Sequence, residues 1–148
     1  MPTYIYETID TTKPRREFFV KQSVHDDPLQ ADPETGAPFF IKRLSGVPGD
    51  VLRIDPPLFY VQGKLADGYG FSRVMGAKDG YRGYAPGRDY LSDSTKTYTV
   101  PPHNFYAMGD NSYNSLDSRW WGPVPEENLV GRGLFVYWPF VPHWGFIR

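Results

Sequence analysis

The chain has 148 residues, of which 40% are apolar and 17% aromatic, and its 16 basic and 17 acidic side chains leave a formal net charge of −1. This length and composition suit one domain with a single core, and the small net charge argues against a nucleic-acid partner. Because the chain contains no cysteine, disulfides, thiol catalysis and thiolate metal sites are excluded.

Short apolar runs between glycines and prolines predict a mainly β chain. The 15 Gly and 15 Pro residues break any helix longer than a few turns, and the runs between them are rich in Val, Ile, Tyr and Phe, which favour strands. In chain order, we expect strands at residues 17–21, 39–44, 50–54, 59–61, 96–100, 104–108 and 133–138.

Turn signals and one irregular segment separate these strands. Pro48-Gly49-Asp50 predicts a tight turn, because Pro pre-sets one backbone dihedral and Gly supplies a positive one. Residues 125–129 are expected to form one helical turn that begins with Pro and places acids near the positive end of its dipole. Residues 63–94 are rich in Gly and lack periodicity, so we expect a looped insertion there. An aromatic binding site within this segment is the alternative.

Neither a metal site nor a membrane span is expected from the chain. His25, His103 and His143 are far apart in sequence and lack ligand spacing. No stretch reaches the ~18 consecutive apolar residues that a membrane span needs, and no basic segment followed by an apolar run begins the chain. The aromatic run at residues 133–147 is expected to be a core strand with an apolar tail; a patch at a membrane interface is the alternative.

The most informative feature is a pair of motifs. Residues 108–122 read MGDNSYNSLDSRWWG and are followed by VP at 124–125 and LVGR at 129–132. Gly, Asn, Asp and Ser disfavour a regular helix, so this composition predicts a polar loop. Upstream, residues 41–50 read IKRLSGVPGD.

The two motifs resemble boxes of the type I signal peptidase (leader peptidase) family. That family's patterns are Lys-Arg-x-x-Gly-x-Pro-Gly-Asp and, further along, Gly-Asp-Asn, Ser-x-Asp-Ser-Arg, Trp-Gly and Val-Pro. The resemblance covers residues 39–140 and is strongest at the two boxes. It implies a mainly β fold, with an antiparallel β-sheet or barrel-like core, and a serine endopeptidase that works through a Ser/Lys dyad without a cofactor or metal ion.

The resemblance assigns the catalytic roles to Lys42 and Ser115. A lysine in water has a pKa near ~10.4 and cannot act as a base at neutral pH. Burial beside apolar neighbours destabilises the ammonium and lowers that pKa, so Lys42 is implied as the general base. Ser115 is implied as the hydroxyl that accepts a hydrogen bond from the lysine amine and orients it.

Other residues of the boxes are implied as supports of the site. Ser115, Asp117 and Arg119 occupy alternate positions and would share a face of an extended segment. Asp117 and Arg119 are expected to form an ion pair that holds the loop; an exposed salt bridge of little value is the alternative. Arg43, Gly109, Asp110 and Asn111 are the remaining supporting residues.

One part of the family's pattern has no counterpart in these 148 residues. The family's nucleophilic serine precedes the lysine box and is followed by Met, any residue and Pro-Thr, but no serine of this chain is followed by Met. Met1-Pro2-Thr3 matches the end of that pattern and would place the nucleophile two residues ahead of Met1; a chance Pro-Thr is the alternative. We therefore expect an N-terminally truncated single domain, residues 1–148, that is inactive by itself.

The chain is thus predicted to be a portion of a type I signal peptidase. The expected partners are the signal peptides of exported preproteins and, through the parent protein, a membrane surface, with the catalytic domain on the extracytoplasmic side. An inactive relative that binds a peptide by strand addition, or has an assembly role, is the alternative. A carbohydrate-binding β module is disfavoured, because sugar stacking has no use for the lysine box.

Overall fold

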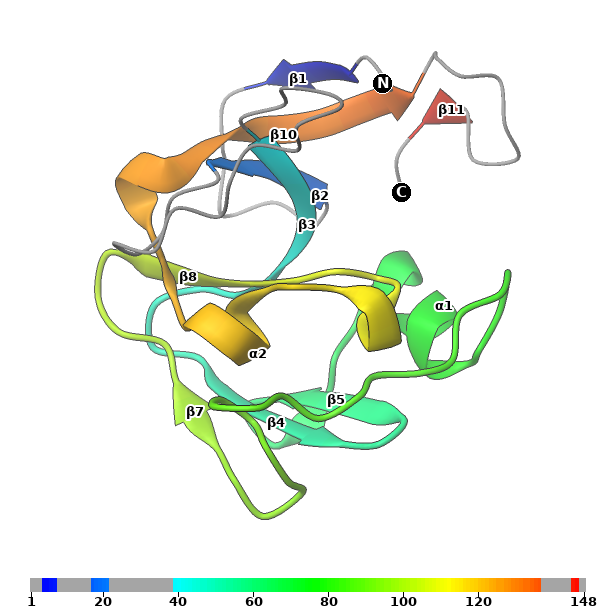
Figure 1. Ribbon diagram of the computed structural model, residues 1–148, viewed down its shortest axis with the longest axis vertical. Helices are drawn as coiled ribbons and strands as arrows, with labels where there is room; N and C mark the ends of the chain where they lie inside the picture. Colours follow the sequence, from blue (N-terminus) through cyan, green and yellow to red (C-terminus); the bar gives the residue numbers. More distant parts are fainter. Residues whose placement is uncertain (1–3, 8–16, 22–38, 137–144, 147–148) are drawn as a thin grey trace.

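Two antiparallel sheets make up most of the computed structural model, which describes residues 4–7, 17–21, 39–136 and 145–146, with side chains from residue 42 to residue 129 (Figure 1). The larger sheet contains β1 (Tyr4–Glu7), β2 (Glu17–Lys21), β3 (Phe39–Gly46), β8 (Asn104–Met108), β9 (Val124–Pro125), β10 (Leu129–Val136) and β11 (Gly145–Phe146). The smaller sheet contains β4 (Val51–Asp55), β5 (Leu58–Val61), β6 (Lys64–Leu65) and β7 (Tyr98–Thr99).

The expected antiparallel β architecture is confirmed, but the sheets remain open. The larger sheet has the order β1-β10-β2-β3-β8-β9, with β11 paired to β10, and the smaller has the order β6-β5-β4-β7. Within the described residues neither sheet closes on itself, so this part of the chain contains no closed barrel. At the end of β3, the turn at residues 47–50 carries the chain from the larger sheet into β4 of the smaller one.

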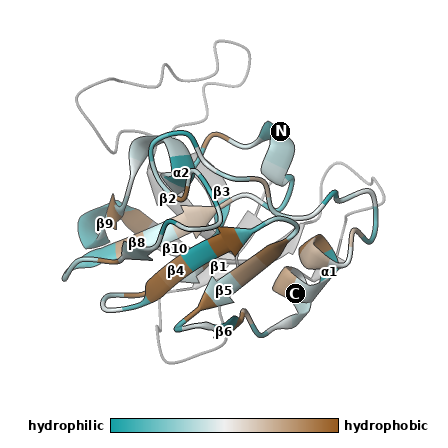
Figure 2. Ribbon diagram, turned by 90° about the horizontal axis from the view of Figure 1, so that it is seen from below, coloured by the Kyte–Doolittle hydropathy of each residue, from teal (hydrophilic) through white to brown (hydrophobic). Residues whose placement is uncertain are grey.

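The core forms where the smaller sheet packs against β8. Along β4 the burial alternates with period two, so that Leu52 and Ile54 point inward. They pack with Tyr106 and Met108 of β8 in one cluster, and Figure 2 shows the corresponding hydrophobic stretches of β4 and β5 side by side. Gly46 permits this approach, because a Cβ there would lie 2.8 Å from Leu52 Cδ1.

Most predicted strands are present. The bounds of β2 and β8 match the predictions, and β3, β4, β5, β7 and β10 each overlap a predicted strand. The turn expected at residues 125–129 contains the 3₁₀ helix η2 (Glu126–Asn128). The sequence did not predict β1, β6, β9 or β11, each of which has only two to four residues and offers little alternating pattern. Residues 137 and 138 of the last predicted strand lie outside the described residues.

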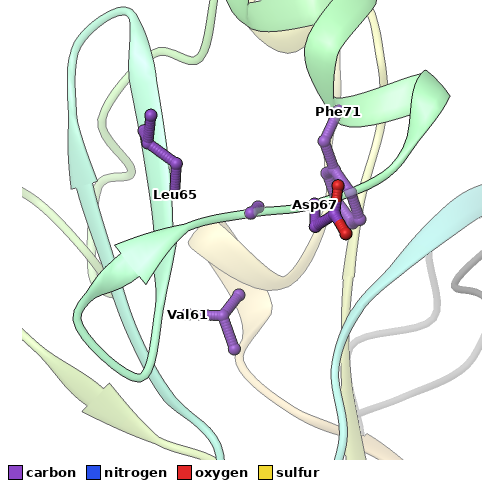
Figure 3. A pocket seen from close by; sticks show the side chains of 5 residues that line it. Val61, Leu65, Asp67 and Phe71 are labelled. Carbon is purple, nitrogen blue, oxygen red and sulfur yellow. The ribbon is translucent and has the colours of Figure 1, made fainter.

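Residues 63–94, expected to form an irregular insertion, contain helix α1 (Tyr69–Met75). Phe71, Val74, Tyr84 and Leu91 from this segment are buried in the main core cluster. The helix also borders an open pocket of about 270 Å³ beside β5 and β6. Figure 3 shows the pocket and its lining residues, Val61, Leu65, Ala66, Asp67 and Phe71.

Candidate active site

Lys42 and Ser115 come together across two separate parts of the chain. Lys42 lies on β3, and Ser115 directly follows the 3₁₀ helix η1 (Ser112–Asn114). Lys42 Nζ donates a hydrogen bond of 3.0 Å to Ser115 Oγ, although 73 positions separate the two residues. The contact expected from the motifs is therefore present.

The surroundings of Lys42 favour its neutral amine. Burial lowers the pKa of Lys42 below the ordinary lysine value, since removal from water destabilises the ammonium. The nearby Asp117 carboxylate opposes this effect, and the Arg119 guanidinium reinforces it. With burial as the largest of the three influences, the pKa of Lys42 remains below the ordinary lysine value.

Gly109 allows the lysine and serine to lie against the backbone of the loop. A Cβ at this position would be 2.1 Å from Ser115 Oγ and 3.6 Å from Lys42 Nζ. Because any larger residue would displace the serine hydroxyl, the space at Gly109 is a condition for the contact.

An ion pair joins the two motifs directly beside this contact. Arg43 follows Lys42 on β3, and Asp110 follows Gly109. Arg43 Nε and Nη2 each donate to one oxygen of the Asp110 carboxylate at 2.7 Å, while the Arg43 side chain is only 2% exposed. Such a two-bond pair fixes orientation as well as distance, so it sets the register of the loop on β3.

A second and more deeply buried pair joins Asp117 and Arg119. Arg119 Nη2 and Nε donate to the Asp117 carboxylate at 2.6 and 2.8 Å, and the Arg119 and Asp117 side chains are 1% and 0% exposed. Asp117 also accepts from the backbone N–H of Gly109 at 2.9 Å and of Arg119 at 3.1 Å. The expected pair is present, and it is buried rather than an exposed salt bridge.

The segment around this pair is not extended, although the alternate spacing of Ser115, Asp117 and Arg119 favours an extended segment. Residues Ser118–Trp121 form the one-turn helix α2, and the Asp117 side chain caps its N-terminus. An Asp that accepts a backbone N–H at this position stabilises a helix start. Asp117 and Arg119 therefore meet through a cap and a helical turn instead of along one face of a strand.

Several residues that complete the site were not anticipated from the motifs. Arg119 Nη1 donates to the Ala85 carbonyl at 2.9 Å and also to Ser112 Oγ, and Nη2 donates to the Ser112 carbonyl at 2.9 Å. Ser112 Oγ in turn accepts from the Ala85 N–H at 2.8 Å. Ser118 Oγ accepts from the Ala107 N–H at 2.9 Å. The serines lie within the recognised motif, whereas no sequence signal marks Ala85.

The remaining candidates lie apart from this network. Asn111 is exposed at the start of η1, where its carbonyl accepts from the Asn114 N–H at 3.0 Å. His103 is exposed and has Nδ1 3.6 Å from Glu126 Oε2. The other two histidines lie outside the described residues. Throughout the described part of the chain, no group of three or more His, Asp or Glu side chains is placed to hold a metal ion.

No helix within the described ranges is both long enough and apolar enough to cross a bilayer. The aromatic C-terminal run lies largely outside those ranges, so its assignment to a core strand or a membrane interface stays a prediction.

Comparisons with known proteins agree with the motifs. The family model described as "Signal peptidase, peptidase S26" matches residues 19–138. The chain is 37% identical to the probable signal peptidase I-2 of Synechocystis sp. over 108 residues, which are 73% of this chain and 42% of that protein. It is 32% identical to signal peptidase I S of Bacillus subtilis over 102 residues, 68% of this chain and 53% of the relative. The chain thus spans about half the length of these curated relatives.

A solved structure shares the fold. The crystal structure of a signal peptidase I from Enterococcus faecalis V583 superposes with a TM-score of 0.50 at 22% identity, covering 81% of this chain and 96% of that one. At this level of identity the likeness concerns the fold alone.

Proposed function

Because the chain belongs to the signal peptidase family, peptidase S26, we propose that it is the base-bearing portion of a type I signal peptidase, which cleaves signal peptides from exported preproteins. The observation that carries this proposal is the part-buried hydrogen bond between Lys42 and Ser115, together with the lowered pKa of the Lys42 amine. The names of the relatives, which are signal peptidases I, support the same activity.

In the proposed mechanism, Lys42 acts as the general base. Its neutral amine takes the proton of a serine hydroxyl as the serine oxygen attacks the scissile carbonyl, and the resulting ammonium returns a proton to the leaving amine. Water then hydrolyses the acyl-enzyme ester. Ser115 accepts a hydrogen bond from the amine and fixes its direction, so that the nitrogen lone pair faces the nucleophile.

The supporting residues act by holding Lys42 and Ser115 in this geometry. We assign this role to Gly109, which leaves room for the serine hydroxyl, and to the pairs Arg43–Asp110 and Asp117–Arg119. Asn111, exposed at the edge of the loop, is the supporting residue with the least structural backing.

We further propose that the nucleophilic serine is supplied by sequence outside these 148 residues, and that the chain without it is inactive. The support is that none of the serines of the chain is followed by Met, as the family's nucleophile is. In this proposal residues 1–148 belong to one catalytic domain, which is membrane-associated and on the extracytoplasmic side of its membrane.

The test is to supply the missing element. An N-terminal extension that carries Ser-Met ahead of Pro2-Thr3 together with a membrane anchor should produce cleavage of a preprotein at its signal peptide. Lys42→Ala should abolish this cleavage, while Lys64→Ala, at an exposed lysine of β6, should not. The rate should rise with pH through a limb below the pKa of free lysine, because the reactive form is the neutral amine and burial lowers the pKa of Lys42.

An extended protein that folds but fails to cleave several different preproteins would overturn the peptidase assignment. The inactive relative, with a peptide-binding or assembly role, would then be the better description. Cleavage that persists in Lys42→Ala would instead remove Lys42 from the mechanism.

A further inference from the structure

The segment at residues 63–94 contacts both ion pairs of the candidate site. Its helix α1 lies against Arg43, and its later part lies against Arg119. Figure 1 shows this chain leaving α1 and passing α2 on the way to β7. Neither arginine therefore depends only on its own acidic partner for its position.

The contact at Arg43 is made by a glycine inside helix α1. A Cβ on Gly70 would lie 2.1 Å from Arg43 Cζ and 2.2 and 2.4 Å from its two terminal nitrogens. The neighbouring Phe71 ring faces the same guanidinium, with its centroid 5.7 Å from Cζ. The guanidinium is thus enclosed between the backbone of α1 and the Asp110 carboxylate.

A glycine within a helix is less favourable than an alanine, because its backbone loses more conformational freedom on folding. Gly70 is buried and helical, with no positive φ to explain its presence. The close approach of Arg43 gives a physical reason for glycine at this position. A methyl group could be accommodated only if the guanidinium moved, and the two 2.7 Å bonds to Asp110 hold it in place.

The contact at Arg119 is made by residues 85–90. The amides of Arg88, Asp89 and Tyr90 all donate to the Arg119 carbonyl, at 3.2 to 3.3 Å. A Cβ on Gly87 would lie 2.7 Å from Arg119 Cβ, so the backbone also packs directly on this residue.

We propose that the segment at residues 63–94 positions the Lys42–Ser115 contact, with Gly70 as a positioning residue that acts through the Arg43–Asp110 pair. The chain of contacts has three steps. Gly70 receives the Arg43 guanidinium, Arg43 holds Asp110, and Asp110 adjoins Gly109, against which Ser115 and Lys42 lie. The catalytic role of the Lys42–Ser115 contact rests on the proposed function. The geometry of the contact is independent of that function.

The test measures the titration of Lys42 directly in the 148-residue chain. Lysine labelled with ¹³C at Cε reports each amine by NMR, and Lys42→Arg identifies the Lys42 signal. In Gly70→Ala, we expect the titration midpoint of Lys42 to shift upward toward that of ordinary lysine. Displacement of Arg43 loosens the loop, and both water entry and an unpaired Asp110 carboxylate favour the ammonium. The Nε–H signal of Arg43 should change in the same variant.

Control variants separate positioning from helix stability. Ser72→Ala changes an exposed residue of the same helix and should not move the Lys42 midpoint. Val74→Ala removes a fully buried core side chain of α1, so it should lower the melting temperature without shifting the midpoint. Leu65→Ala enlarges the pocket beside α1 and should also leave the midpoint unchanged.

A double variant keeps the proposal falsifiable if Gly70→Ala fails to fold. Arg43→Lys retains the charge but removes the planar fork, which leaves space for the added methyl group. We expect Gly70→Ala to have no further effect on the midpoint in the Arg43→Lys background, and the double variant to fold. An unchanged midpoint in Gly70→Ala, or a double variant that also fails to fold, would overturn the proposal. Because no cleavage is measured, failure of the peptidase assignment would leave this result unaffected.

Discussion

At the scale of single residues, Lys42 links stability to pH. Its pKa is lowered in the folded chain by burial, so between that lowered value and the ordinary value of 10.5 the unfolded chain binds more protons than the folded one. The free energy of unfolding therefore rises with pH across this window. Below the window the folded protein holds a buried ammonium, which is unfavourable.

Replacing Lys42 by Met should remove this pH dependence. We expect Lys42→Met to be more stable than the parent chain below the lowered pKa, with the difference shrinking as the pH approaches 10.5. Urea unfolding at a series of pH values measures the difference, and Lys64→Met at an exposed site serves as the matched control. A difference that is constant with pH would show that Lys42 titrates alike in both states.

The buried pair is the second feature at this scale. Asp117→Ala should destabilise the fold by roughly 3–5 kcal/mol, because it leaves the Arg119 guanidinium buried without its carboxylate. For a domain of this size the melting temperature should fall by roughly 10 °C. The same substitution at Asp89, whose side chain is 62% exposed beside Arg88, should change stability by less than ~0.5 kcal/mol. Equal melting curves for the two variants would contradict the importance of the pair.

At the scale of elements, helix α2 is defined by its two ends. Asp117 caps the start of the helix. Gly122 ends it with φ 86° and ψ −160°, a backbone conformation that residues other than glycine rarely adopt. A Cβ on Gly122 would also lie 2.8 Å from Tyr90 Cζ. The length of this helix is thus set by backbone geometry at a crowded position.

Gly122→Ala should therefore be costly. We expect about 1–3 kcal/mol from the backbone alone, and a further loss from displacement of Tyr90. Gly49→Ala is the matched control, since Gly49 has φ 87° and a Cβ added there would meet no atom within 4 Å. Urea unfolding of the two variants measures both losses of stability, and their difference is the part caused by the clash with Tyr90. If Gly122→Ala is no less stable than Gly49→Ala, Tyr90 can move away freely.

At the scale of the whole molecule, β8 connects the two sheets. It pairs with β3 and β9 through its backbone, while its side chains Tyr106 and Met108 belong to the core cluster of the smaller sheet. Opening of either sheet therefore disturbs the other, and the described part of the chain should unfold as one cooperative unit.

Hydrogen exchange of the backbone amides tests whether the two sheets unfold together. The amides of Ala107 and Met108 should be among the slowest and should exchange only by global unfolding. Those of β6, whose two residues are exposed, should exchange many times faster. Fast exchange along β8 while β4 stays protected would mean that the sheets open independently.

Much of the fold followed from short-range patterns. The short runs rich in Val, Ile, Tyr and Phe predicted strands at β4 and β8 that the structure contains, because strand preference depends largely on residue type. Helix α1 was not predicted, since its seven residues include a glycine whose purpose is visible only beside Arg43. Helix α2 was hidden within a loop composition, because one capped turn is too short for periodicity.

The sequence by itself determined the family motifs, the mainly β class and the residue types at the candidate site, because these depend on residue identity and local spacing. Only the tertiary structure decided that Lys42 meets Ser115 across 73 positions, that the Asp117–Arg119 pair is buried, and that Gly70 and Ala85 complete the surroundings of the two arginines. Burial, and with it the lowered pKa of Lys42, is a property of the assembled fold, since it depends on which distant segments exclude water from the same amine.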